Sequence, residues 1–282
     1  MRAVRAAAYA VVSISLLTAC GRATGSSAAP APAAEPTVTL AAAPAAALVN
    51  VASTALVEEA PAAPSACPDG MLLVEGDYCP NVQLNCRRYL DAPGGRFSEF
   101  RCAEYAPSTC RSKERVHKRF CIDQYEYRAS GSTLPENHQS WTMADKTCRG
   151  LGKRTCWESE YNFACEGEEL RPYPYGFDRD ATACNADHTD VVDATGKLKD
   201  MRAAPGEYPR CASPFGVMDL AGNLEEFVSI DGSTPVRPAM KGAYWQPSRN
   251  FCRAAQTAHD RYYNGTETGF RCCSDPADAR AD

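Results

Sequence analysis

The chain has 282 residues, a formal net charge of -5 at pH 7 and fifteen cysteines. A weakly negative chain without a run of basic residues is not expected to bind nucleic acid, because such binding needs clustered Lys and Arg. The stretch from Cys67 onward is long enough for one domain, or for one domain with a small appendage.

Residues 1–19 predict a cleaved export signal. Two arginines precede an uncharged, mostly apolar stretch over residues 6–17, which is shorter than the roughly 20 residues needed to span a membrane. The stretch ends in Leu17-Thr18-Ala19-Cys20, which resembles the lipobox of bacterial lipoproteins. That resemblance implies a lipid on Cys20, whereas an ordinary signal peptide with an incidental cysteine is the alternative. We expect a lipid-anchored protein of the bacterial cell envelope, on the outer membrane or facing the periplasm.

Residues 20–66 predict a disordered tether. After Cys20 they are nearly all Ala, Pro, Ser, Thr and Val, with three Glu, one Arg and no aromatic residue. Such a segment cannot bury enough apolar area to offset the entropy lost on ordering, and its prolines keep it extended. Residues 277–282 are expected to form a disordered tail.

The cysteine count is the strongest compositional signal. Without Cys20, fourteen of the fifteen cysteines remain, which is an even number. No Cys-x-x-Cys pair and no zinc-like Cys/His spacing occurs, so an exported chain is expected to form seven disulfides. Each would contribute about 2–4 kcal/mol to the free energy of unfolding.

Two regions follow the tether. Residues 67–115 form a cysteine-rich segment with a turn signal at Pro68-Asp69-Gly70, followed by an expected short strand over residues 71–74. Residues 116–276 form the main domain, which begins with an aromatic-rich strand over residues 120–128.

Two short helices are expected next. The first covers residues 141–151, is capped by Ser140 or Thr142 and ends at Gly152. The second follows the capping-box spacing of residues 155–158 and places Trp157, Tyr161 and Ala164 on one core-facing side. After Cys165 the periodicity fades, and long loops are expected as far as Val217.

Short motifs follow one another in a specific order along residues 115–275. In chain order they are Thr142-Met143-Ala144, Gly152-Lys153-Arg154, Glu158-Ser159-Glu160-Tyr161, Phe163-Ala164-Cys165, Tyr173-Pro174-Tyr175-Gly176, Cys184-Asn185, Phe215–Asn223, Lys241–Trp245 and Gly269-Phe270-Arg271-Cys272. Together they resemble the formylglycine-generating enzyme, or sulfatase-modifying factor, family. The resemblance implies a disulfide-rich α+β fold related to C-type lectins, with little regular secondary structure.

The active enzymes of that family oxidise a sulfatase cysteine to formylglycine, using copper held by two cysteines after a Gly-Gly-Ser-Tyr-like motif. The corresponding loop here, residues 242–252, contains only Cys252, which best matches a structural cysteine of the family. A cuprous ion prefers thiolates, so copper binding is not expected and no catalytic residue is assigned. The family's Trp-Glu-Trp also reads Glu225-Glu226-Phe227, which removes an aromatic residue near the substrate cleft.

The resemblance further implies two disulfides, Cys148–Cys272 and Cys165–Cys252. We add Cys184–Cys211 and Cys121–Cys273 as expectations of our own. The partners of the other six cysteines stay open, namely those of Cys67, Cys79, Cys86, Cys102, Cys110 and Cys156.

The resemblance also implies structural calcium, an ion that takes six to eight oxygen ligands from carboxylates and carbonyls. One site would use the side chains of Asp219 and Glu226 with the carbonyls of Gly222 and Leu224. A second would use Asn185 and the carbonyl of Ala186. The alternative is a capped tight turn, in which Asp219 and Asn223 flank Gly222.

We therefore expect an envelope lipoprotein whose domain binds a protein, peptide or glycan without catalysis. The alternative is a formylglycine-type oxidase with a rebuilt active site. Free thiols would discriminate between the two, because an oxidase needs reduced cysteines.

Overall fold

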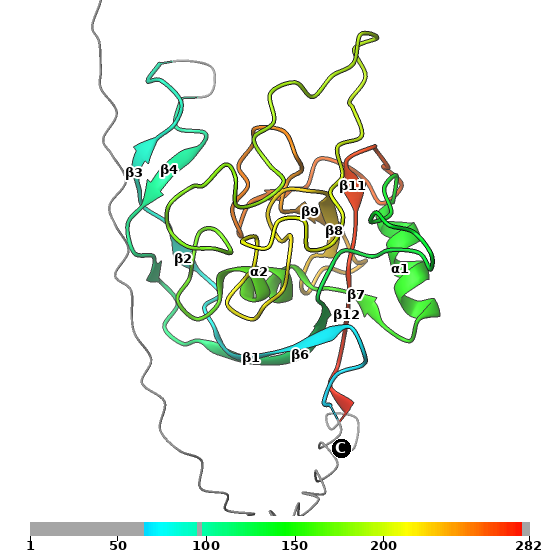
Figure 1. Ribbon diagram of the computed structural model, residues 1–282. Coiled ribbons are helices and arrows are strands. Elements are labelled where there is room, and N and C mark those ends of the chain that lie inside the picture. The colour runs from blue at the N-terminus through cyan, green and yellow to red at the C-terminus, as the bar shows by residue number, and fades with distance from the viewer. Residues whose placement is uncertain (1–64, 95–97, 278–282) are drawn as a thin grey trace, which may run out of the picture. The chain divides into compact units, whose positions relative to one another are not determined.

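The computed structural model describes residues 65–94 and 98–277, so Cys20, the export signal and nearly all of the tether lie outside the described residues. Within these described residues the fold is α+β, with two helices, twelve short strands and long loops between them (Figure 1). No helix within the described ranges is long and apolar enough to cross a membrane.

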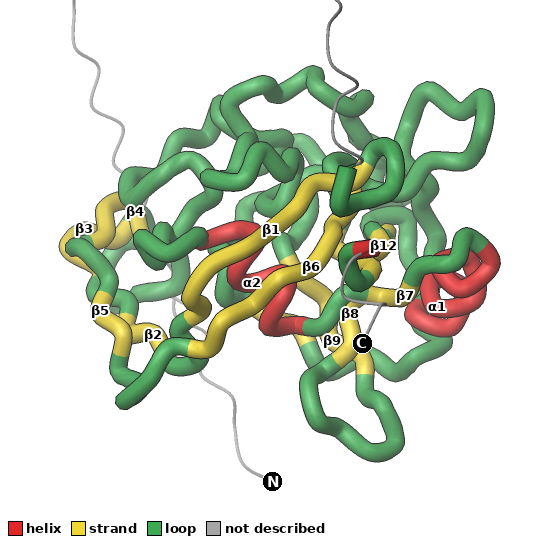
Figure 2. The backbone as a smooth tube through the Cα atoms, turned by 90° about the horizontal axis from the view of Figure 1, so that it is seen from below, coloured by secondary structure: helices red, strands yellow, loops and turns green. Residues whose placement is uncertain are grey.

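The first sheet contains strands from the beginning and from the end of the domain's sequence. Its strand order is β1 (Met71–Tyr78), β6 (Val116–Asp123), β12 (Cys272–Ser274) and β7 (Arg154–Thr155). β1 pairs with β6 along its whole length, and the two run side by side in Figure 2. The cysteine-rich segment therefore contributes an edge strand to the main domain, and this strand extends beyond the expected residues 71–74.

The expected strand over residues 120–128 lies earlier in the chain. β6 ends at Asp123, because the next residues bond to loops instead of to the sheet. The amide of Gln124 donates to the carbonyl of Gly70 at 3.0 Å, and that of Tyr127 to the carbonyl of Phe270 at 2.8 Å. Glu126 is consequently turned into the protein interior.

The second sheet has the order β10 (Ala255–Gln256), β9 (Pro238–Lys241), β8 (Glu225–Ser229) and β11 (Thr268–Gly269). Two small antiparallel pairs, β2 (Val82–Gln83) with β5 (Thr109–Cys110) and β3 (Cys86–Tyr89) with β4 (Cys102–Tyr105), complete the strands. The β3–β4 pair lies at the opposite end of the domain from α1 (Figures 1 and 2).

Both expected helices form. In α1 (Trp141–Gly150) the Ser140 hydroxyl caps the helix by accepting the Met143 amide at 3.2 Å. In α2 (Glu158–Glu166) the Glu160 carboxylate accepts the Trp157 amide at 2.8 Å. The capping spacing expected for residues 155–158 is wrong, because Arg154 and Thr155 belong to β7 and pair with β12.

The core lies between the first sheet and α2. Tyr161, Phe163 and Ala164 of the helix are fully buried against Val74 and Ile122 of the sheet. Burying a side chain such as Phe163 stabilises the fold by about 1.5–3 kcal/mol. Between residues 167 and 224 the structure has only isolated bridges, as the loss of periodicity predicts.

Seven disulfides connect these loops and strands. They are Cys67–Cys121, Cys79–Cys110, Cys86–Cys102, Cys148–Cys272, Cys156–Cys273, Cys165–Cys252 and Cys184–Cys211. Three of the four expected pairs are among them.

The expected Cys121–Cys273 pair is wrong. Cys273 stands opposite Ile122 in the antiparallel register of β12 and β6. Because side chains alternate along a strand, Cys121 points to the other face of the sheet. Cys121 therefore bonds to Cys67 on that face, and Cys273 bonds to Cys156.

Candidate ligand-binding site

The residues expected to hold calcium surround a buried ion pair. Glu226 of β8 is fully buried, and its two carboxylate oxygens accept hydrogen bonds from Nε and Nη2 of Arg271, both at 2.7 Å. The Tyr161 hydroxyl also lies 3.4 Å from one of these oxygens. The Arg271 guanidinium thus supplies the positive charge that a cation would bring to Glu226.

Two further carboxyls lie close to this pair. Glu126, which the sequence did not single out, accepts the Leu224 amide at 2.9 Å and a second bond from the Asn223 side chain. Burial raises the pKa of Glu126, and the charges of Glu226 and Asp219 raise it further. Burial likewise raises the pKa of Asp219 to about 7. Both carboxyls thereby take up a proton more readily than usual.

The second expected site shares the same network. The Asn185 side chain donates to the carbonyl of Met201 at 2.8 Å and to the side chain of Asn223 at 2.9 Å. Its oxygen lies 2.8 Å from Nε2 of His188. At Gly222, φ is +86° and an added Cβ would lie 2.4 Å from the Asn185 carbonyl oxygen, so the chains can meet only at a glycine. The Cβ of Ala186 would lie 3.1 Å from the same added Cβ at Gly222.

These contacts do not fit a calcium site. Calcium needs carboxylate and carbonyl oxygens that point at one centre, but both oxygens of Glu226 accept from Arg271. Across the described residues, no group of three or more His, Cys, Asp or Glu side chains is placed to hold a metal ion. In the structure, the oxygens of Glu226 and the side chain of Asn185 are instead engaged by hydrogen bonds within the protein.

The loop between β9 and β10 does not fit a copper site either. Its one cysteine, Cys252, is fully buried and bonded to Cys165 of α2. The Cys252 amide donates to the carbonyl of Pro172 at 2.8 Å, which fixes the end of the loop. All fourteen cysteines from Cys67 to Cys273 are in disulfides, so the loop has no thiolate for a cuprous ion.

One end of the second sheet is acidic. Glu225 begins β8, and its amide donates to the carbonyl of Glu267 at 2.8 Å. Burial, and then the charge of Glu267, raise the pKa of the Glu225 carboxyl to about 7. The Tyr263 hydroxyl donates to the Glu267 carboxylate at 2.6 Å, and burial raises the pKa of Tyr244 to about 12. Glu225 therefore stands, half-buried, where the family has an aromatic residue.

The cysteine-rich segment reaches this end of the sheet. The guanidinium of Arg249 lies 5.1 Å from the ring centre of Phe100, which precedes β4. Two cavities, of about 130 and 190 Å³, flank this pair of side chains. Tyr173 holds β4 in place by donating its hydroxyl to the Cys102 carbonyl at 2.6 Å. No sequence signal indicated that Phe100 would lie here.

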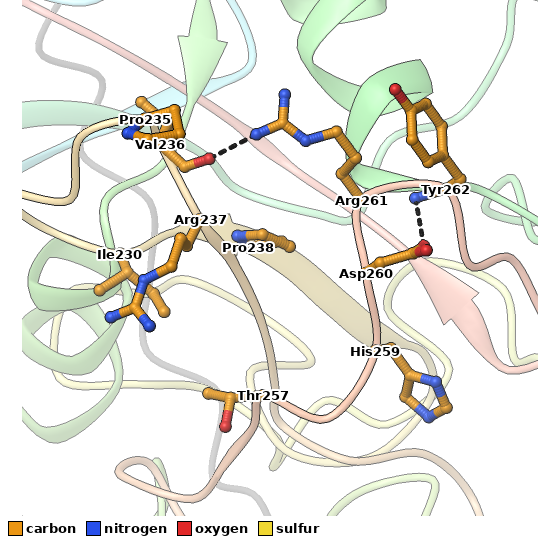
Figure 3. Close-up of a pocket in the computed structure, with 10 residues that line it drawn as sticks. All are labelled: Ile230, Pro235, Val236, Arg237, Pro238, Thr257, His259, Asp260, Arg261 and Tyr262. Atoms are coloured by element: carbon orange, nitrogen blue, oxygen red, sulfur yellow. Dashed lines mark hydrogen bonds between the residues drawn. The ribbon is translucent and has the colours of Figure 1, made fainter.

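The opposite end of the same sheet holds a larger pocket of about 730 Å³ (Figure 3). β8 and β9 are antiparallel, with Ser229 opposite Pro238, and Gln256 of β10 stands opposite Met240. The loop after β8 and the loop after β10 therefore leave the sheet at the same end of the strands. The pocket lies between them and is lined by Ile230, Pro235, Val236, Arg237, Pro238, Thr257, His259, Asp260, Arg261 and Tyr262.

Local contacts fix the shape of this pocket. The Asp260 carboxylate accepts the amides of Tyr262 and Tyr263 at 2.8 and 3.0 Å. Arg261 donates from Nη2 to the Val236 carbonyl at 2.7 Å and lies 5.1 Å from the ring centre of Trp141. The rings of His259 and Tyr263 stack with their centres 3.7 Å apart. The loop after β10 thus contributes basic and aromatic side chains, whereas residues 230–238 contribute aliphatic side chains together with Arg237.

Comparison with known proteins gives a family and a fold. A family model described as the sulfatase-modifying factor enzyme 1-like domain matches residues 84–276. The structure of PvdO from Pseudomonas aeruginosa is similar with a TM-score of 0.50 and 15% identity, over 73% of this chain and 94% of that one. The structure of CarF is similar with a TM-score of 0.46 and 12% identity, over 74% of this chain and 98% of that one. At these identities the likeness concerns the fold alone, and no curated protein matches in sequence.

Proposed function

The chain belongs to the sulfatase-modifying factor enzyme 1-like family over residues 84–276, and from that premise we propose that its domain binds a ligand instead of oxidising cysteine. The domain would be presented at the bacterial cell envelope by a lipid on Cys20 and by the tether of residues 20–66. The ligand would be another molecule of the envelope.

The observation that carries this proposal is the state of Cys252. It is the one cysteine in the loop where the active enzymes have their copper ligands, and its sulfur is buried and bonded to Cys165. Oxidation through a thiolate needs a reduced, accessible sulfur, which this position does not provide. Glu225 and Arg249 line the small cavity beside the loop instead.

A count of thiols on the full mature protein tests the proposal. The protein is alkylated under denaturing conditions, before and after reduction, and the modified cysteines are identified by mass spectrometry. We expect no alkylation before reduction and fourteen modified cysteines afterwards, since every cysteine from Cys67 to Cys273 is in a disulfide.

A second measurement tests the oxidase alternative directly. The protein is incubated with cuprous ion, dioxygen and a peptide carrying the cysteine motif of a sulfatase, and the peptide is examined for an aldehyde. We expect the cysteine to be recovered unchanged. Two or more free thiols together with aldehyde formation would overturn the proposal and indicate an oxidase with a rebuilt active site.

A further inference from the structure

We propose that the pocket between the loops after β8 and β10 binds a peptide in which a carboxylate stands next to an apolar side chain. This inference rests on the proposed binding function and gives it a site and a ligand class. The carboxylate would contact Arg237, and the apolar side chain would contact the aliphatic residues around it.

The charge of the pocket favours an anionic ligand. Arg237 is exposed at the pocket and makes no side-chain hydrogen bond or ion pair with any residue that the structure describes. Arg261 uses one of its five N–H donors on the Val236 carbonyl. The lining carboxylate, Asp260, already accepts two backbone amides. Arginine donors without a carboxylate partner suit the planar, two-oxygen geometry of an incoming carboxylate.

Two side chains of the pocket, those of Arg261 and His259, are held in position before any ligand arrives. Arg261 is fixed by its carbonyl acceptor and by the face of Trp141. His259 is held by stacking on Tyr263, whose hydroxyl is in turn bonded to Glu267. A site whose side chains are already ordered loses less conformational entropy on binding.

The aliphatic residues around Arg237 favour a peptide over a sugar. Four of the ten lining residues, Ile230, Pro235, Val236 and Pro238, present aliphatic surface, which can accept an apolar side chain. Tyr262, which is 67% exposed, offers an aromatic face at the rim, so a polysaccharide is the competing ligand in the test below. A volume of about 730 Å³ lies within the range of small-ligand pockets, and it accommodates one or two peptide residues.

The balance of charge in the pocket adds to the preference. The lining carries two arginines, Arg237 and Arg261, against one carboxylate, Asp260. An acidic peptide would therefore be attracted to the pocket. Such complementarity raises specificity and the rate of association.

The test uses the full mature protein and two fluorescein-labelled hexapeptides. One alternates glutamate and valine, and the other has glutamine in place of each glutamate. We expect fluorescence anisotropy to show that the glutamate peptide binds roughly tenfold more tightly or better, as expected for a hydrogen-bonded charge pair. Arg237→Gln should reduce its affinity by a similar factor.

Arg210→Gln is the matched control. Arg210 is an exposed arginine paired with Asp180 in another loop, so its loss changes the net charge equally without touching the pocket. It should bind the glutamate peptide like the unmodified protein. Because the exposed Arg237 side chain makes no hydrogen bond or ion pair with the described residues, thermal melting of Arg237→Gln should match that of the unmodified protein.

Three outcomes would overturn the inference. They are equal binding of the two peptides, equal affinity of the Arg237→Gln and Arg210→Gln variants, and binding of a galacturonate hexasaccharide by a protein that binds neither peptide. Each leaves the proposed function standing if the thiol count is zero. Aldehyde formation on the sulfatase-motif peptide would instead refute the proposed function, irrespective of how the two hexapeptides bind.

Discussion

Arg271 and Glu226 form an ion pair that is almost completely excluded from solvent, with side-chain exposures of 1% and 0%. The pair joins the residue that precedes β12 to the second residue of β8, and so links the two sheets. Arg271 also donates to the carbonyls of Asp123 and Gln124 at the end of β6, at 3.3 and 3.2 Å. One guanidinium therefore holds together three segments that are far apart in sequence.

Removal of this guanidinium should destabilise the fold strongly. Arg271→Met leaves Glu226 buried without a charged partner, and we expect a loss of about 3–5 kcal/mol in the free energy of unfolding. The double variant Arg271→Met/Glu226→Gln should recover part of the loss, because it no longer buries an unpaired charge. Urea unfolding with the disulfides intact measures both. A loss below about 1 kcal/mol in the single variant would contradict the buried pairing.

Calcium should have little effect on stability, although the family resemblance implies calcium sites. The oxygens of Glu226 are engaged by Arg271, and the Asn185 side chain is engaged by Asn223, Met201 and His188. A ligand stabilises a protein only if it binds the folded state more tightly than the unfolded state. The melting temperature should therefore be the same in millimolar calcium and in a chelator. A rise with calcium concentration would show that the loop around Gly222 rearranges to hold the ion.

Lys241 should make stability rise with pH in the alkaline range. It is fully buried, and desolvation lowers its pKa to about 8, despite Glu158 at 3.3 Å. Above that pH the folded state has lost a proton that the unfolded state keeps up to its ordinary pKa near 10.4, so the free energy of unfolding increases. Relative to Lys241→Met, the unmodified protein should gain about 2 kcal/mol between pH 7.5 and 9.5. Urea unfolding of both proteins at the two pH values measures this, and a constant difference would refute the lowered pKa.

Motifs in the sequence predicted the fold better than they predicted the site. Helix limits near Ser140 and Gly152 follow from local capping, and the motif order gave the family, because both depend on residues close in sequence. The extension of β1 to Tyr78 was missed, because strand length there is decided by pairing with β6. Local patterns cannot report a partner that lies far along the chain.

The site depends on the same kind of distant contact. Glu126 reads as one polar residue in an aromatic-rich strand, yet the chain turns it into the core beside Glu226. Phe100 and Arg237 carry no motif, and they reach their sites only because disulfides and sheet register place their loops there. Calcium was implied by the family resemblance, which carries no information on the contact between Glu226 and Arg271.

Lipidation of Cys20 can be tested in cells. If the cysteine is the acceptor, labelled palmitate should enter the protein, and Cys20→Ala should abolish the label because no thiol remains to be acylated. The labelled protein should also partition into the detergent phase of a Triton X-114 extract, because of its lipid. A matched Ser15→Ala variant within the signal should be labelled as before. Labelling of Cys20→Ala would refute the lipobox.

The pairing of the adjacent cysteines Cys272 and Cys273 can be mapped without mutation. Because neighbouring side chains in β12 point to opposite faces, the first bonds to Cys148 of α1 and the second to Cys156 before α2. Proteolysis under non-reducing, acidic conditions followed by mass spectrometry should find peptides around residues 148 and 156 joined to the peptide with both cysteines. Cleavage between Cys272 and Cys273 by partial acid hydrolysis should then separate the two linkages. A Cys121–Cys273 linkage would mean that β12 is shifted by one residue against β6, which would also turn Cys272 away from α1.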